Sequence, residues 1–198
     1  MPSRINKSAI IKEPFEHIII DGFINPLWVK ATEAGFLETV EMNHDNTGLP
    51  VTERIYTTKT LHPAQGKLFH LKNDLIKAVN ETWDLNVVKV IMSENILQSD
   101  DYIGPHTDVW YPEIPVRGIL YLNKEKKYGT HLYTMFEDYH DAIPPIEAGG
   151  EPGQLLLIRV SKDSHHSVGM FSDLGDRITL NFMFSTVDDI PRTINNFS

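Results

Sequence analysis

The pattern of apolar and polar positions divides the chain into a first part with helical periodicity and a longer β part. A β-branched run from Phe15 to Phe23 predicts a strand closed by a turn, after a loosely held lead-in of residues 1–13. Asn25-Pro26 then supplies a cap and a helix-starting proline for an amphipathic stretch to about Val40. A second helix is predicted between residues 64 and 83, where apolar side chains recur at steps of three and four: Leu68, Leu71, Leu75, Val79 and Trp83.

From residue 86 onward the chain consists of short apolar runs interrupted by Pro and Gly. These runs predict strands at residues 86–98, 116–122, 131–135, 154–160 and 178–184. Helices followed by many short strands favour a mainly β fold, a sandwich or barrel with N-terminal helices packed on the outer face of one sheet. We interpret residues 44–50 and 144–153 as loops, because Pro, Gly and polar residues dominate them.

The last strand carries two different faces. Ile178, Leu180, Phe182 and Phe184 alternate along it and form an apolar face that we expect to receive the helices. The other face carries Arg177, Thr179 and Asn181. A row of polar side chains that points inward has no purpose in an ordinary core, and it indicates an interior that holds a polar ligand.

Length and composition indicate one globular domain. The 198 residues are 41% hydrophobic and 23% charged, values that are ordinary for a chain able to bury its own core. We expect residues 1–85 to form a strand and helical support region, residues 86–186 the catalytic β core, and residues 187–198 a weakly ordered tail.

Cysteine content and charge exclude several function classes. The chain has no cysteine, so disulfides, thiolate metal sites, iron–sulfur clusters and cysteine nucleophiles are excluded. The net charge of −9 and the lack of a basic cluster argue against a nucleic-acid surface. Because no segment resembles a signal core or a membrane span, we expect a soluble cytoplasmic protein without a membrane partner.

The candidate chemistry starts at Gly104-Pro-His-Thr-Asp-Val109. If the backbone is extended there, His106 and Asp108 leave it on the same face and can converge on one ion. A third ligand is available in the downstream segment 163–168, which contains two histidines. Two imidazoles and one carboxylate suit non-haem Fe(II), because they leave three coordination positions open. With 9 His and 27 acidic residues, a His-x-acid triplet is expected about once by chance. The triplet is therefore significant only together with other motifs.

The triplet and three other motifs together resemble those of a known family. The sequence carries, in order, His106-Thr-Asp108, Ile119-Leu-Tyr-Leu-Asn123, His166-Ser-Val168 and Arg177-Ile-Thr-Leu180. Together they are similar to the motifs of Fe(II)- and 2-oxoglutarate-dependent dioxygenases, most of all the prolyl-4-hydroxylase-like branch. The resemblance covers roughly residues 102–184, and the opening strand at Pro14-Phe15 also resembles that branch. It implies a double-stranded β-helix, the cupin-like jelly roll.

The resemblance also implies a ligand set for the metal. His106, Asp108 and His166 would hold Fe(II). His165 competes with His166, and in a strand the two point to opposite faces, so that only one can bind. The family's His-x-Val pattern selects His166, which is followed by Val168. The carboxylate of Asp108 favours hydroxylation, because halogenases of the family lack it.

A second set of residues would bind the cosubstrate. Arg177 would grip the distal carboxylate of 2-oxoglutarate with its planar fork of donors, and Thr179 shares its face. Tyr121 matches a family tyrosine that contacts 2-oxoglutarate, and Tyr102 is a further candidate contact. Other interpretations remain open: Arg177 as the surface partner of Asp173 or Asp176, and Tyr121 as a core residue.

The implied reaction is hydroxylation of an unactivated C–H bond, with release of succinate and CO2. It requires Fe(II), 2-oxoglutarate and O2, with ascorbate as a candidate additional cofactor. The substrate is a peptide or protein residue, with proline the leading choice, or a small molecule. Trp110 and Tyr111 are candidates for the mouth of the site, and residues 128–153 for a lid or rim. Two other hypotheses are a catalytically silent jelly-roll binding module and a cupin-like metalloenzyme that does not use 2-oxoglutarate.

Overall fold

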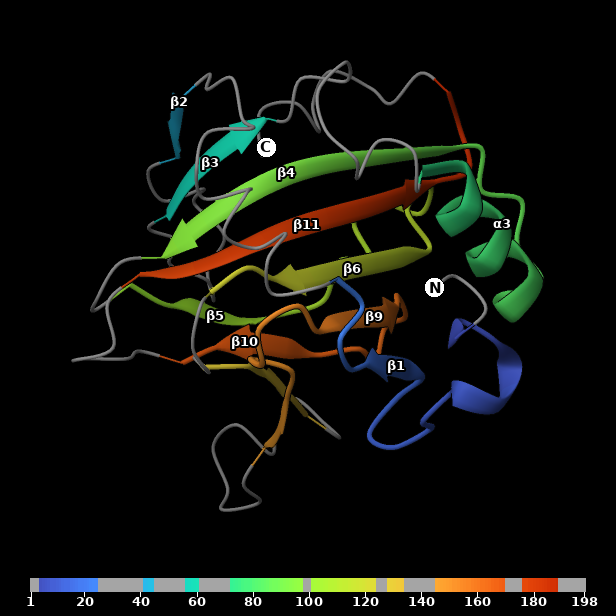
Figure 1. The fold of residues 1–198 in the computed structure, drawn as a ribbon, viewed down its shortest axis with the longest axis horizontal. Helices are drawn as coiled ribbons and strands as arrows, with labels where there is room; N and C mark the ends of the chain where they lie inside the picture. Colours follow the sequence, from blue (N-terminus) through green and yellow to red (C-terminus); the bar gives the residue numbers. More distant parts are fainter. Residues whose placement is uncertain are drawn as a thin grey trace.

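The computed structural model describes residues 4–24, 41–44, 56–60, 72–97, 101–123, 128–133, 145–169 and 176–188. Within these ranges the chain is mainly β (Figure 1). The elements are η2 (Lys7–Ala9), β1 (His17–Ile20), β2 (Glu41–His44), β3 (Tyr56–Thr60), α3 (Lys72–Trp83), β4 (Lys89–Leu97), β5 (Ile103–His106), β6 (Val116–Tyr121), β7 (Thr130–Leu132), β8 (Ile146–Ala148), β9 (Leu155–Arg159), β10 (His166–Val168) and β11 (Arg177–Ser185).

The strands form two antiparallel sheets. The larger sheet has seven strands in the order β1-β9-β6-β11-β4-β3-β2, and the smaller has four in the order β5-β10-β7-β8. Strand β11 is central to the larger sheet, pairing with β4 over nine residues and with β6 over six. Two antiparallel sheets with few helices are consistent with a jelly roll. Among the described residues no helix is both long and apolar enough to span a membrane.

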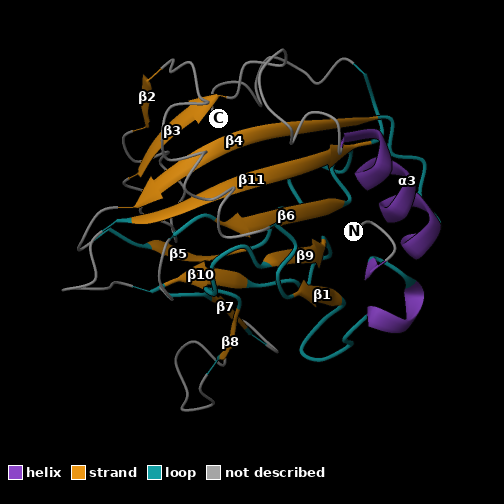
Figure 2. Cartoon of the chain, viewed as in Figure 1, coloured by secondary structure: helices purple, strands orange, loops and turns teal. Residues whose placement is uncertain are grey.

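The two faces of the larger sheet have different partners. On one face Leu180, Phe182 and Phe184 of β11 belong to a single apolar cluster with Leu75 and Val79 of α3. Helices α3 and η2 lie on the same side of the molecule (Figure 2). Each fully buried side chain of this size contributes about 1.5–3 kcal/mol of hydrophobic stabilisation. This face therefore supplies most of the apolar core.

The opposite face of the larger sheet looks toward the smaller one. Here Tyr121 of β6 and Leu156 and Ile158 of β9 pack with Leu132 of β7 and Ala148 of β8. By strand alternation, Arg117 and Ile119 share the face of Tyr121, and Arg177 and Thr179 share one face of β11. The polar row predicted from the sequence therefore lies on the face that looks into the space between the sheets.

Several predicted elements are present with small changes of boundary. The strands predicted at 86–98, 116–122, 154–160 and 178–184 correspond to β4, β6, β9 and β11, and the run from Phe15 contains β1. Strand β7 starts one residue before the predicted 131–135 and ends at Leu132, and residues 134–135 lie outside the described residues. The helix predicted at 64–83 is described from Lys72, while the helix predicted at 25–40 falls outside the described residues.

Three expectations about irregular segments were wrong. His44, the first residue of the predicted loop 44–50, ends strand β2 instead, while residues 45–50 lie outside the described residues. The expected loop at 144–153 contains β8, which is only three residues long. Strand β3 was not predicted, because Tyr-Thr-Thr-Lys-Thr has no apolar alternation. In the lead-in, Ile5 is buried in the same cluster as Leu180, and Asn6 caps η2 by accepting from the Ser8 amide. These segments are therefore structured by pairing and packing that no local pattern records.

Candidate metal centre

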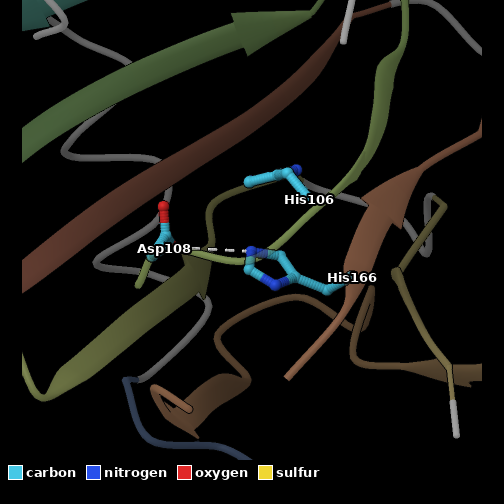
Figure 3. Close-up of side chains that lie close together, drawn as sticks. All are labelled: His106, Asp108 and His166. Carbon is cyan, nitrogen blue, oxygen red and sulfur yellow. Dashed lines mark ion pairs between the residues drawn. The ribbon is translucent and has the colours of Figure 1, made fainter. Parts of the chain in front are cut away.

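Three side chains from two adjacent strands and one turn converge between the sheets. His106 is the last residue of β5, His166 is the first residue of β10, and Asp108 follows β5 by two residues (Figure 3). Their candidate ligand atoms all lie within 4.8 Å of one another. His166 Nε2 is 3.6 Å from Asp108 Oδ2, and the centroids of the two imidazole rings are 4.3 Å apart.

The register of the smaller sheet explains why the two imidazoles meet. His106 and His166 are direct partners in the antiparallel pairing of β5 with β10. Directly opposite residues project from the same face of a sheet, with Cβ atoms about 5 Å apart. Two residues that are sixty positions apart in sequence therefore become neighbours by strand pairing alone.

Asp108 reaches the histidines by a different route from the one expected. Strand β5 ends at His106, so alternation along an extended strand does not place Asp108. The chain turns immediately afterward, and the Tyr111 amide donates to the Asp108 carbonyl at 3.2 Å. This turn leaves the carboxylate buried beside His166.

Backbone carbonyls determine which imidazole nitrogen is available. His106 Nδ1 lies 2.9 Å from the Gly104 carbonyl oxygen, and His166 Nδ1 lies 2.9 Å from the Ser164 carbonyl oxygen. Because a carbonyl can only accept, each neutral ring must carry its proton on Nδ1 and keep the lone pair on Nε2. Such a second hydrogen bond fixes the tautomer and the ring orientation of histidines that ligate metals.

The donor set fits a divalent metal of the kind expected from the sequence. Metal bonds to imidazole and carboxylate are about 2 Å long, so neighbouring ligands on one face of an octahedron lie about 3 Å apart. The distances among the three groups are close enough for small side-chain movements to satisfy this spacing. Two nitrogens and one carboxylate on one face leave three positions for other ligands, the arrangement of non-haem Fe(II) sites.

Arg177 is buried, with only 2% of its surface exposed. Its Nε donates to the Tyr128 carbonyl at 2.9 Å, and its Nη2 donates to Thr130 Oγ1 at 3.3 Å. Burial lowers the pKa of the guanidinium, but arginine keeps its proton in proteins. Arg177 is therefore not the surface residue that one interpretation expected. Of its two suggested partners, Asp176 is exposed and Asp173 lies outside the described residues.

Tyr121 and Thr130 lie in contact with the buried Arg177 side chain. The Arg177 guanidinium carbon lies 5.2 Å from the centroid of the fully buried Tyr121 ring. The Tyr121 hydroxyl lies 2.8 Å from Thr130 Oγ1 and donates to the Ala148 carbonyl at 3.0 Å. Burial raises the pKa of Tyr121, although the positive charge of Arg177 opposes that shift. A cation, a neutral phenol and a hydroxyl thus lie in contact with one another in the interior.

The remaining predicted residues occupy different surroundings. Thr179 is buried and is the direct partner of Tyr121 in the pairing of β11 with β6, so its side chain belongs to the same face. Tyr102 is half-buried just before β5. His165 is also half-buried, burial lowers its pKa, and among the described residues it is not part of the group that can hold a metal.

The sequence interpretation missed two residues, Arg117 and Thr130. Arg117 lies on β6 and its Nη2 donates to Asp108 Oδ1 at 3.1 Å. The available signal was an arginine four positions before Tyr121 in an otherwise apolar strand, since alternation gives both side chains the same face. Thr130 gave no comparable signal, because its role depends on which strands lie opposite β7.

Comparison with known proteins finds its matches at the level of structure. No family model matches the sequence, and no curated protein does. A prolyl-4-hydroxylase from Pseudomonas putida superposes with a TM-score of 0.64 at 14% identity, covering 86% of this chain and 92% of that one. An oxidoreductase of the 2OG-Fe(II) oxygenase family from Burkholderia pseudomallei gives 0.64 at 10% identity, covering 96% and 92%. The chain has the fold of the 2OG-Fe(II) oxygenases.

A third match extends this oxygenase fold to a different ligand. HygX from Streptomyces hygroscopicus, with nickel, 2-oxoglutarate and hygromycin B bound, superposes with a TM-score of 0.57 at 14% identity, covering 87% of this chain and 83% of that one. The resemblance to prolyl hydroxylases and 2OG-Fe(II) oxygenases that the sequence suggested is therefore present in the fold. At these identities the likeness is one of architecture, so the activity has to be argued from the residues of this chain.

Proposed function

We propose that the protein is an Fe(II)- and 2-oxoglutarate-dependent oxygenase that hydroxylates its substrate. The observation that carries the proposal is the convergence of His106, Asp108 and His166, with each histidine Nδ1 held by a backbone carbonyl. The oxygenase fold and the buried Arg177 support the same assignment.

The chain's own residues would divide the work in two. His106 Nε2, His166 Nε2 and Asp108 Oδ2 would ligate the metal, leaving one side of it open. A metal bound there would supply the chemistry by which 2-oxoglutarate and O2 are converted to succinate and CO2, with one oxygen atom of O2 entering succinate and the other the substrate hydroxyl. The protein contributes ligand orientation and exclusion of water, since Asp108 and His166 are buried between the sheets.

Arg177 would bind the distal carboxylate of 2-oxoglutarate. Two of its nitrogens are held by Tyr128 and Thr130, which fixes the plane of the guanidinium. Thr179 would add a hydrogen bond, and Tyr102 is a further proposed contact. The Tyr121 hydroxyl, which donates to the Ala148 carbonyl in this structure, would have to turn its proton from that carbonyl to the cosubstrate. Leu132 is the strand partner of His166, and Thr130 lies two residues before it on β7. Two residues along a strand span about 7 Å. That separation suits a cosubstrate that contacts both the metal and the arginine.

The substrate is proposed to be a peptide residue, with proline the leading choice, or a small molecule. Proteins with this fold include a prolyl-4-hydroxylase and a protein that binds hygromycin B, so the fold accommodates both classes. Trp110 is 72% exposed beside Asp108, and an exposed indole there would offer a flat surface to either. O2 is the proposed oxidant and ascorbate a candidate additional cofactor.

The proposal is tested by turnover without a primary substrate. Purified protein incubated with Fe(II), 2-oxoglutarate and O2 should form succinate slowly. Arg177→Met should abolish this at low 2-oxoglutarate concentration, because a methionine cannot bind a carboxylate. Arg159→Met is the matched control: Arg159 lies on β9 and donates to the Pro115 carbonyl at 2.7 Å, outside the proposed pocket.

A second measurement separates the other two hypotheses. An anaerobic titration of Fe(II)-loaded protein with 2-oxoglutarate should produce a weak visible charge-transfer band. Ligand binding without iron uptake would indicate a catalytically silent binding module. Iron uptake with no band, and no effect of Arg177→Met, would indicate a cupin-like metalloenzyme that does not use 2-oxoglutarate.

A further inference from the structure

Arg117 contacts both oxygens of the Asp108 carboxylate. Its Nη2 donates to Oδ1 at 3.1 Å, and its Nε lies 3.1 Å from Oδ2. The two side chains are largely buried, with 18% and 10% of their surfaces exposed. One hydrogen bond, from Nη2, and one close ion-pair contact, from Nε, which makes no hydrogen bond here, thus join the guanidinium to the two carboxylate oxygens.

Asp108 needs such a partner more than the histidines do. His106 and His166 are fixed by a strand pair and by a carbonyl bonded to each Nδ1. Asp108 lies two residues past the end of β5, in a turn closed by the Tyr111 amide. The terminal torsion of an aspartate is also broad, so a carboxylate alone has no strongly preferred plane.

The contact leaves one oxygen facing the centre of the site. Oδ2 is the atom 3.6 Å from His166 Nε2, whereas Oδ1 accepts from Arg117 Nη2. Each carboxylate oxygen has two lone pairs, so Oδ2 can face Arg117 Nε with one and the site with the other. Oδ2 is therefore the oxygen that we expect to face an ion held by the histidines.

We propose that Arg117 is a positioning residue that holds Asp108 as a one-oxygen metal ligand. The inference rests on the proposed metal centre. It assigns a role in metal binding to Arg117 of β6, a residue that lies outside the four motifs described above. Loss of an outer partner of this kind typically costs about 10- to 100-fold in metal affinity.

The opposite interpretation makes a prediction of opposite sign. If Arg117 served only as a countercharge for a buried carboxylate, it would compete with the metal for Asp108. Removing it would leave a buried charge that only the ion could neutralise, and metal affinity would rise. Positioning instead predicts that affinity falls, even when the positive charge is kept.

The test measures binding of Co(II) alone to the full-length protein, anaerobically and without 2-oxoglutarate. Arg117→Lys keeps the charge and loses the fork, and Arg117→Gln loses the charge and keeps a planar amide. We expect both to weaken Co(II) binding about 10- to 100-fold and to change the visible spectrum of the bound ion. Arg159→Lys, on the neighbouring strand β9, should bind as the wild type does.

The outcomes are distinguishable from one another. Unchanged affinity in Arg117→Lys, or tighter binding in Arg117→Gln, would overturn the positioning role while leaving the metal centre intact. Failure of the wild type to bind Co(II) would overturn both. In an Asp108→Asn background, Arg117→Lys should cause no further loss, since the residue it positions is already impaired.

Discussion

Three buried or half-buried histidines each make the same type of local hydrogen bond. His17, His106 and His166 each direct Nδ1 to the carbonyl two residues earlier, at 2.8–2.9 Å. This contact is set by the local backbone, so it does not by itself mark a metal ligand. The surroundings of Nε2 make the difference: His106 and His166 face Asp108, whereas the ring of His17 lies against Phe15.

His17 gives the first prediction, for the pH dependence of stability. Burial holds the pKa of His17 below its ordinary 6.5, so near pH 6 the unfolded chain binds more protons than the folded one. Stability is therefore retained above about pH 6.5 and lost as pH falls below it. In His17→Gln this loss should be smaller. Urea unfolding of metal-free protein at several pH values measures it, and parallel curves for the two proteins would contradict the prediction.

The second prediction distinguishes the two adjacent histidines. His166→Ala removes a proposed ligand and should reduce Co(II) affinity by more than about 100-fold. This is the upper end of the loss expected when only a partner of a ligand is removed. His165→Ala is its matched control, because His165 is the neighbouring residue and lies outside the group of three. Equilibrium dialysis gives both affinities. A larger loss in His165→Ala would reverse the assignment.

At the scale of elements, apolar runs and alternation predicted the longest strands and missed strands β3 and β8. Strands β4, β6, β9 and β11 have five to nine residues, enough for apolar runs or alternation to be visible. Strand β8 has three residues next to Gly149 and Gly150, and β3 is rich in threonine. Their strand state comes from their partners, which are tertiary contacts.

The candidate site divides in the same way. His106, Asp108, His166 and Arg177 could be located because their order and spacing form a motif. Thr130 could not, and the only signal for Arg117 was its place four positions before Tyr121 in an apolar strand, since each acts on a residue of another strand or turn. Which strand lies opposite is decided by packing of the whole sheet, and spacing along the sequence does not encode it.

The third prediction concerns the turn after β8. Gly149 has a φ of +82°, and a Cβ there would overlap the ring of Tyr121. Gly149→Ala should lower the free energy of unfolding by about 1–3 kcal/mol for overpacking, in addition to backbone strain of about 1 kcal/mol. It should also displace Tyr121 and weaken 2-oxoglutarate binding while sparing Co(II) binding.

Gly22 offers the control for that substitution. It also has positive φ, +54°, but a Cβ there would meet nothing within 4 Å. Gly22→Ala should therefore show the strain of about 1 kcal/mol alone, with normal 2-oxoglutarate affinity. Equal effects of the two substitutions on the free energy of unfolding and on 2-oxoglutarate affinity would mean that the contact with Tyr121 contributes to neither.

At the scale of the whole molecule, stability and chemistry occupy opposite faces of one sheet. On β11, Leu180, Phe182 and Phe184 pack in the cluster that includes α3, while Arg177 and Thr179 lie on the face shared with Tyr121. Neighbouring residues of a single strand therefore serve different purposes. The two sheets enclose the candidate site, and α3 belongs to the apolar cluster on the other face of β11.

The fourth prediction follows from this separation. Leu180→Ala should lower the free energy of unfolding by about 2–5 kcal/mol, because it leaves a cavity in the apolar cluster, with little change in 2-oxoglutarate affinity. Thr179→Val, which removes only a hydroxyl, should weaken 2-oxoglutarate binding with a much smaller effect on stability. Denaturation and anaerobic titration of both variants measure this. Wild-type 2-oxoglutarate affinity in Thr179→Val would remove Thr179 from the proposed pocket.

The exposed side chain of Trp110 has a practical consequence. It is two residues beyond Asp108, 72% exposed, and one of three tryptophans in the chain. A paramagnetic ion bound by the neighbouring carboxylate would quench the fluorescence of this indole, and a docked substrate would shift its emission to shorter wavelength by removing water from the ring. The protein thus carries an intrinsic optical probe two residues from a proposed ligand of its candidate centre.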